Sequence, residues 1–276
     1  MENGRVRSGV RAASRGGGGR EVTARCGLLA RGVLYALVGM LALRVASGDP
    51  GGGGEEADRQ GALEELAGRP FGGVLVWAVG IGLVGMVLWR LSEAVFGAAG
   101  PEGKAPVKRL TAAGRTVCYV AVAFSVLSFA AGGGGRSGDQ QSRDMTARAL
   151  DLPAGQWLVG AAGLGIALAG AVIAVQAARR RFRKHLAMGG VSPRWRAAVG
   201  FLGVTGGLAR GALFAAVGGF VVYAAVRFDP AQAKGTDDTL RSFALTPAGP
   251  WLLVAVALGL MLFGAFSWAM ARWREV

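Results

Sequence analysis

The sequence has few of the residues on which most enzymes and metal proteins depend. Its 276 residues include one histidine and two cysteines. Cys26 and Cys118 form no CxxC motif, and His185 has no second histidine for metal binding or proton relay. We therefore expect no metal site, no cofactor and no catalytic residue, and we interpret the protein as non-enzymatic.

Acidic residues are also scarce. There are 17 of them against 31 basic residues, of which four are lysine, and the formal net charge is +14. A charge of this size can indicate a nucleic-acid partner. Here, however, the basic residues lie in blocks between long apolar runs, and 52% of the chain is hydrophobic. This pattern is typical of a polytopic membrane protein, so we expect lipid contacts and no nucleic acid.

Six apolar stretches are each long enough to cross a bilayer as a helix of about 20 residues. We place these spans at 27–46, 71–96, 110–131, 155–178, 203–226 and 248–271. Residues 1–25 precede them, with six arginines and a glycine tract, and we expect this segment to be disordered. Because the pattern of the first span recurs later in the chain, we interpret it as a retained helix and not as a cleaved signal peptide.

The basic residues also predict an orientation. The N-terminal segment, the second and fourth connections and the C-terminal tail together hold 18 of them, whereas the other three connections hold eight. The positive-inside rule then places both termini in the cytoplasm of a bacterial plasma membrane, with anionic lipids at the cytoplasmic face. Trp157 and Trp251, at the outer starts of two spans, agree with this orientation.

The chain contains three copies of one unit. "LARGVLY" at 29–35 returns as "LARGALF" at 208–214 and, more loosely, as "AGRTVCY" at 113–119. Each copy continues through an outer connection with a short amphipathic piece, then a P-x-G motif and a second span. We therefore predict an all-α membrane protein with pseudo-threefold symmetry, built from parallel hairpins at 26–97 (repeat 1), 109–179 (repeat 2) and 198–276 (repeat 3).

The "ARGxLY" entry and the "GALxxLAxxPFG" outer piece, repeated with three hairpins, resemble the bacterial membrane-protein family called domain of unknown function 1206. The resemblance extends over nearly everything from Cys26 onward. It implies two transmembrane helices per domain and three domains per chain. The family carries no known activity, so the resemblance implies no catalytic residue.

The arginines of the repeated motif, Arg31, Arg115 and Arg210, lie in the cytoplasmic halves of their spans. One interpretation is that each extends along its helix to the phosphates of the inner face. A second is that each arginine bonds a loop carbonyl or a neighbouring helix and so holds the hairpins together. The third follows from the repeat, because equivalent residues of three parallel repeats lie on a ring about the axis. If they point inward, they surround one vestibule that binds an anion or a lipid head group. We expect the aromatic residue four positions after each arginine to serve in packing.

Two further features of the sequence concern helix packing and acidic charge. Gly203, Gly207 and Gly211 form a GxxxG stripe, which permits close helix approach within the chain or in a homo- or hetero-oligomer. The acidic residues of the first outer connection, Asp58 among them, are interpreted as a solvated face, the alternative being that they attract cations. Two main functions remain open: a structural or accessory membrane protein that acts through lipid contact, and a small anion or lipid-head-group transporter or channel along the axis. An intramembrane enzyme ranks third.

Overall fold

The computed structural model describes the backbone of residues 3–47, 56–96, 106–133, 137–182, 191–245 and 249–273. It describes the side chains of the same ranges except residues 3–20, 96 and 106–111. These ranges contain helices and turns and no strand. The six long helices are α1 (Asn3–Ser47), α3 (Gly72–Phe96), α4 (Pro106–Ala130), α6 (Gly155–Ala178), α7 (Pro193–Arg227) and α9 (Gly249–Trp273).

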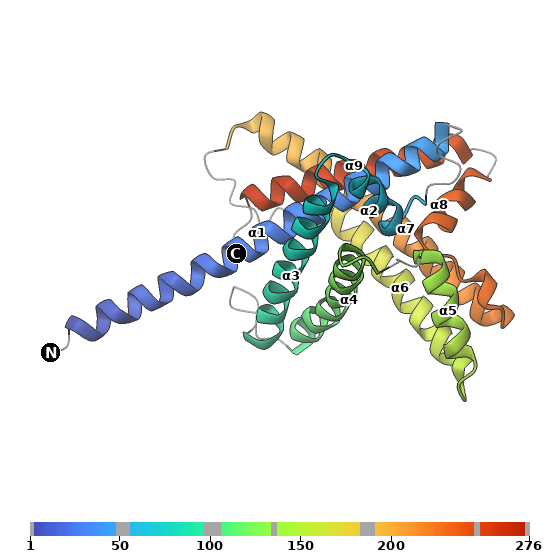
Figure 1. The fold of residues 1–276 in the computed structure, drawn as a ribbon, viewed down its shortest axis with the longest axis horizontal. Helices are drawn as coiled ribbons and strands as arrows, with labels where there is room; N and C mark the ends of the chain where they lie inside the picture. Colours follow the sequence, from blue (N-terminus) through green and yellow to red (C-terminus); the bar gives the residue numbers. More distant parts are fainter. Residues whose placement is uncertain are drawn as a thin grey trace.

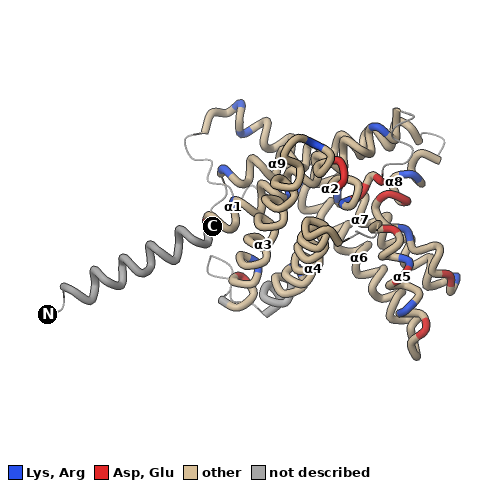
Figure 2. The backbone as a smooth tube through the Cα atoms, viewed as in Figure 1, with Lys and Arg blue, Asp and Glu red and all other residues tan. Residues whose placement is uncertain are grey.

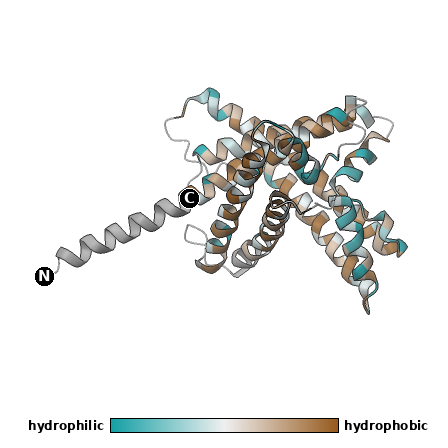
Figure 3. Cartoon of the chain, in the orientation of Figure 1, coloured by the Kyte–Doolittle hydropathy of each residue, from teal (hydrophilic) through white to brown (hydrophobic). Residues whose placement is uncertain are grey.

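All six long helices are long and apolar enough to cross a membrane. The qualifying segments are Glu21–Ser47, Gly72–Val95, Ala112–Ala130, Gly155–Ala178, Pro193–Arg227 and Gly249–Trp273. Figure 3 shows the apolar residues running along these helices, with the polar residues concentrated towards their ends and on the short connecting helices. The predicted class, an all-α membrane protein with six spans in three repeats, is confirmed.

The contacts among the long helices follow the order of an open ring, and Figure 1 shows one of these contacting pairs, α1 and α9, side by side. Helix α1 packs against α3 and α9, α9 packs against α7, and α7 packs against α6, while α3 packs against α4. Over the described residues α4 and α6 form no comparable interface, so the ring has one open seam. Apart from α4 and α6, all neighbouring helices of the ring are in contact, so the helices follow one another around the ring in their order along the chain.

The seam lies inside repeat 2, whose two spans were expected to pair as a hairpin. Both helices expose large apolar side chains on the surface of the bundle, among them Phe124 on α4 and Leu168 on α6. Helix α6 instead packs along α7, because its small residues Gly163 and Gly170 meet the α7 backbone. Close approach to repeat 3 thus replaces the contact within repeat 2.

Three short helices cap one end of the bundle, which we call the short-helix end. They are α2 (Arg59–Ala67), α5 (Gly138–Leu150) and α8 (Thr236–Ala244), one per repeat, with a 3₁₀ turn η2 (Pro230–Gln232) before α8. Leu63 of α2 and Leu240 of α8 are fully buried under the cap. The amphipathic outer pieces predicted from the sequence are therefore helices whose apolar faces close the core.

The P-x-G motifs form the turns that lead from the short helices into the second spans. The middle residues Phe71 and Ala154 are left-handed, each with φ of 61°. The second spans begin at Gly72 and Gly155, two residues after the proline. Glycine is required at these two positions because a Cβ there would collide with carbonyls of the preceding short helix. In the third copy Pro247 and Ala248 lie outside the described residues.

The first helix begins earlier than the sequence predicted. Helix α1 starts at Asn3, so residues 21–25, expected in a disordered segment, are helical. Ala24 is fully buried in a cluster with Met86 of α3 and Met270 of α9, and Arg25 pairs with Glu21 one turn earlier. Burial and this ion pair extend the helix before the apolar run. The side chains of residues 1–20 lie outside the described part of the chain.

Candidate functional site: an arginine cluster within the spanning helices

Four arginines from four long helices lie close together at one level of the bundle, each 15 to 18 residues along its helix from the short-helix end. We call Arg31 (α1), Arg90 (α3), Arg115 (α4) and Arg210 (α7) the arginine cluster. All four lie within helical segments apolar enough to span a membrane. Three of them are the repeated arginines of the sequence, and the structure therefore brings these three together with a fourth.

Arg31 is held from two neighbouring repeats. Its Nε donates to Ser267 Oγ of α9 at 3.2 Å, and its Nη1 donates to Tyr119 Oη of α4 at 3.5 Å. The guanidinium carbon lies 5.2 Å from the centre of the Phe263 ring. The residue is only 7% exposed, and its Nη2 has no hydrogen-bond partner. Arg31 therefore points into the bundle and does not extend to the lipid surface.

Arg210 occupies the same layer from the other side of α1. Its Nε donates to Tyr35 Oη at 2.8 Å. Its guanidinium carbon lies 5.0 Å from the centre of the Phe263 ring and 5.1 Å from that of Phe214. Tyr35 also packs edge-on against Phe263, with 4.8 Å between ring centres and 79° between planes. Aromatic faces and one hydroxyl thus surround this half-buried cation.

These two bonds share one pattern. The arginine of one repeat donates to the tyrosine that stands four residues after the arginine of another repeat. Applied around the axis, the pattern would pair Arg115 with position 214, which is phenylalanine and has no hydroxyl to accept. The packing role predicted for these aromatic residues is therefore incomplete, since Tyr35 and Tyr119 also accept hydrogen bonds. The repeated spacing of an arginine and, four residues later, an aromatic residue indicates from the sequence that these residues act together. It does not show that the arginine of one repeat bonds the tyrosine of another.

The fourth arginine enters through the same symmetry. Arg90 follows Gly72 by 18 residues (72 to 90), as Ser267 follows Gly249 (249 to 267), so Arg90 stands where repeat 3 has the serine that binds Arg31. In repeat 1 this position holds a cation that lies within electrostatic range of Arg115. The junction of repeats 1 and 3 thus has an arginine and a serine, whereas the junction of repeats 2 and 1 has two arginines.

The cluster has more positive charge than the described residues neutralise. Arg90 pairs with Glu93, one turn along α3, with 2.6 Å between Nη1 and Oε2. Among the described residues Glu93 is the one carboxylate that an ion pair joins to the four guanidiniums. Arg90 is 6% exposed, and its Nε, like Arg31 Nη2, is buried without a partner. Arg115, which is exposed, lies beside this unbalanced charge.

The glycine stripe of α7 lies away from this cluster, against α6. A Cβ at Gly211 would lie 2.7 Å from Ala174 N, and one at Gly207 would collide with Ala177. Gly203 is covered by the ring of Phe182. The stripe therefore makes an internal contact between repeats 2 and 3.

The short-helix end carries a second polar cluster, formed by Asp58, Asp139 and Asp237. We call these residues the aspartate triangle, and Figure 2 shows acidic residues where α2, α5 and α8 meet. Each carboxylate accepts a backbone N–H from the next repeat around the axis. The pairs are Asp58 with Gly138 N (2.6 Å), Asp139 with Asp238 N (3.1 Å) and Asp237 with Ala57 N (2.8 Å).

The aspartate triangle corrects the interpretation of Asp58 as part of a solvated face. Asp58 is 2% exposed, and it also caps α2 by accepting from Gly61 N at 3.0 Å. Burial raises the pKa of Asp58, and these N–H bonds oppose the rise. Burial, followed by repulsion from Asp238, raises the pKa of Asp139 to about 6. The carboxylates thus connect the three repeats, and they do so at some electrostatic cost.

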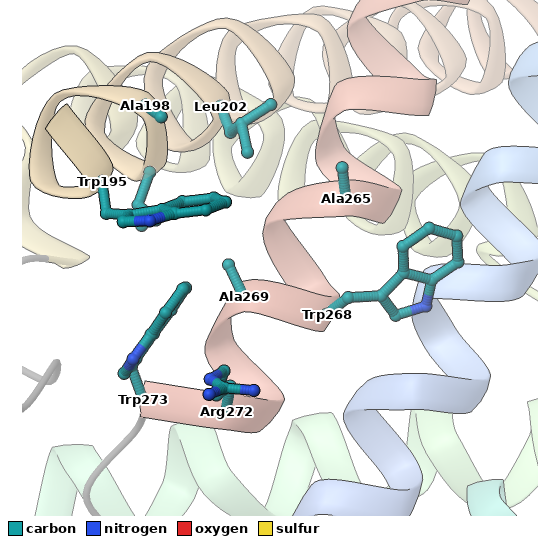
Figure 4. A pocket seen from close by; sticks show the side chains of 9 residues that line it. Trp195, Ala198, Leu202, Ala265, Trp268, Ala269, Arg272 and Trp273 are labelled. Atoms are coloured by element: carbon teal, nitrogen blue, oxygen red, sulfur yellow. The ribbon is translucent and has the colours of Figure 1, made fainter.

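An apolar pocket of about 250 Å³ lies between the start of α7 and the end of α9 (Figure 4). The rings of Trp195 and Trp273 lie there with 6.1 Å between their centres, and Arg272 stands beside Trp273. Trp268 points away from them, and its Nε1 donates to Leu29 O of α1 at 3.2 Å. Three tryptophans therefore mark this end of α7 and α9, as expected where a helix leaves the hydrocarbon region.

A family model described as a Domain of Unknown Function (DUF1206) matches the chain three times, over residues 26–97, 110–180 and 205–274. The chain belongs to the DUF1206 family. One match falls on each of the three repeats, and the resemblance inferred from the motifs is confirmed.

A relative of this DUF1206 protein is the uncharacterized protein YxxB of Bacillus subtilis (strain 168). The two are 30% identical over 245 residues, which cover 88% of this chain and 87% of the relative. No solved structure matches the chain. Neither the family nor this relative carries a stated activity, so any function has to be argued from the site itself.

Proposed function

We propose that this DUF1206 protein is a non-enzymatic membrane protein that binds an oxyanion, of the phosphate type, at the arginine cluster. The phosphate can belong to a lipid head group or to a small solute, since a guanidinium recognises the same oxygens in both. The observation that carries the proposal is the set of four arginines with one paired carboxylate, in which two guanidinium nitrogens are buried without partners.

The energetics of buried charge support an anionic ligand. A guanidinium inside a membrane-spanning segment is costly unless it is paired, and neighbouring guanidiniums repel each other. Serine and tyrosine hydroxyls accept hydrogen bonds from Arg31 and Arg210, and aromatic faces attract their positive charge, but none of these groups supplies a negative charge. An oxyanion with several acceptor oxygens would provide both the charge and the missing hydrogen-bond acceptors.

The position of the cluster favours a lipid contact over a path through the protein. Tyr35 and Phe263 lie in the layer of the arginines, and the aspartate triangle joins the three repeats at the opposite end of the bundle. These contacts between repeats at two levels of the bundle argue against an open path along the axis. Arg115 is exposed on α4, one of the two helices that border the open seam, which supports approach of a head group from the side.

The orientation belongs to the same proposal. The basic residues predict that both chain ends, and therefore the arginine cluster, lie on the cytoplasmic side of a bacterial plasma membrane. Anionic phospholipids at that face would be the most abundant phosphate-bearing ligands. The accessory role would then be to hold or present such a lipid.

The proposal is tested by lipid binding to the purified full chain. Native mass spectrometry would count phosphatidylglycerol and phosphatidylcholine retained by the protein released from mixed nanodiscs. A separate calorimetric titration with inorganic phosphate would show whether the free ion is sufficient. We expect phosphatidylglycerol to be retained preferentially, and Arg115→Ala to reduce its affinity about tenfold, since this is the effect of about 1.4 kcal/mol of lost charge pairing.

Arg227→Ala is the matched control, because Arg227 is an exposed arginine of α7 whose Nε donates to its neighbour Tyr223 at the surface of the bundle. It removes the same charge but lies at the short-helix end, so it should retain wild-type binding. Equal retention of both lipids together with no phosphate binding, or equal binding by wild type and Arg115→Ala, would contradict the proposal.

A further inference from the structure

The aspartate triangle and its neighbour Asp238 offer a site of a different kind at the short-helix end. Asp139, Asp237 and Asp238 each supply one carboxylate oxygen, and these oxygens lie within 4.8 Å of one another. A calcium ion binds carboxylate oxygens at about 2.4 Å, so two ligands of one ion lie at most about 4.8 Å apart. One hard cation can therefore contact all three oxygens at once.

Asp139 gives the independent evidence that something is missing from this set. It is 7% exposed, and its Oδ2 accepts from Asp238 N at 3.1 Å. Its other oxygen, Oδ1, is buried without a hydrogen-bond partner. That oxygen lies against Gly235, at the start of α8, where a Cβ would collide with it. The unpartnered oxygen thus points to the element that carries Asp237 and Asp238.

The charge balance around Asp139 points the same way. Two of the carboxylates have a guanidinium partner, Asp237 with Arg241 and Asp238 with Arg143, whereas among the described residues no ion pair joins Asp139 to a basic side chain. Four other carboxylates lie within electrostatic range of Asp139, and three guanidiniums pair with or lie beside members of this set, so among these described side chains the carboxylates outnumber the guanidiniums by two. The carboxylates are Glu56, Asp58, Asp139, Asp237 and Asp238, and the guanidiniums are Arg59, Arg143 and Arg241.

We infer that Asp139, Asp237 and Asp238 bind one hard divalent cation of the calcium class. Two positive charges would balance the two that are in excess, and the ion would give Asp139 Oδ1 the partner it lacks. Because Asp139 comes from repeat 2 and the other two ligands come from repeat 3, the ion would also join α5 to α8. This inference does not depend on the anion binding proposed above.

The full chain is purified in detergent in the presence of a chelator, and the chelator is then removed. The test is a calorimetric titration of this protein with calcium chloride and, separately, with magnesium chloride. We expect one saturable calcium site per chain. Asp139→Asn should weaken calcium binding by about tenfold or more. An asparagine can still accept from Asp238 N through its carbonyl oxygen, but it places an amide where the free oxygen was.

Asp151→Asn is the matched control, because Asp151 is an exposed aspartate at the opposite end of α5, about 18 Å along the helix. It removes the same charge and should bind calcium like the wild type. Thermal unfolding in chelator verifies that each variant is folded, and Asp238→Asn replaces Asp139→Asn if the latter is not. An absence of saturable heat with both ions, or wild-type affinity in the ligand variant, would overturn the inference.

Discussion

The hydrogen bond between Arg210 and Tyr35 gives the sharpest test of the contacts between repeats. We predict that Tyr35→Phe destabilises the protein by about 1–2 kcal/mol. The substitution removes only the hydroxyl that accepts from Arg210 Nε at 2.8 Å. The ring keeps its edge-on contact with Phe263, at 4.8 Å between centres, and its face towards the guanidinium.

The magnitude follows from two bounds. A hydrogen bond to a charged group contributes about 1.5–3 kcal/mol in soluble proteins. Hydrogen bonds between membrane helices contribute on average about 0.6 kcal/mol and up to about 1.7. Arg210 is charged but only half-buried, so a value between these bounds applies. About 1–2 kcal/mol corresponds to a change of roughly 5- to 30-fold in the folding equilibrium constant.

Reversible unfolding in mixed detergent micelles measures this difference directly. Tyr223→Phe is the matched control, since Tyr223 is exposed and accepts from Arg227 Nε at 3.1 Å at the surface of α7. It should change the free energy of unfolding by less than about 0.5 kcal/mol. If Tyr35→Phe proves no more destabilising than this control, the hydroxyl does not join the repeats and the argument for the arginine layer fails.

Two further predictions concern the other contacts between repeats. Gly211→Leu should destabilise the protein by about 2–3 kcal/mol, because its Cβ would lie 2.7 Å from the α6 backbone, whereas Gly165→Leu, with nothing within 4 Å, should change the free energy of unfolding little. The same micelle assay checks both, and equal effects would refute the internal role of the glycine stripe. Asp58→Ala should lower the thermal midpoint and cost about 2–3 kcal/mol, because Gly61 N and Gly138 N both lose their buried acceptor. Asp151→Ala, at an exposed helix end, is its control, and a midpoint equal to that of this control would contradict the prediction.

Much of the architecture could be predicted from the sequence. Apolar length alone decides that six segments can cross a bilayer, since no other local structure satisfies their backbone there. The repeated "LARGxL" and P-x-G motifs fix the order of the elements, and the symmetry of three parallel repeats implies that Arg31, Arg115 and Arg210 lie on one ring. The fourth arginine, Arg90, was not predicted for this layer, because its own repeat shows it only as a partner of Glu93.

Which repeat contacts which could be decided only by the tertiary structure. Arg210 bonds the tyrosine of repeat 1, and Asp58 accepts from Gly138 N at the start of a helix of repeat 2, and both pairings connect residues that are far apart in the chain. Local periodicity reports one helix at a time, so it cannot show that an apparently solvated aspartate is buried by a neighbouring repeat. The open seam between α4 and α6 has the same origin, because α6 packs on the repeat whose backbone its glycines can approach most closely. The sequence by itself thus determined the spans and their order, whereas the contacts between repeats decided where the charges meet.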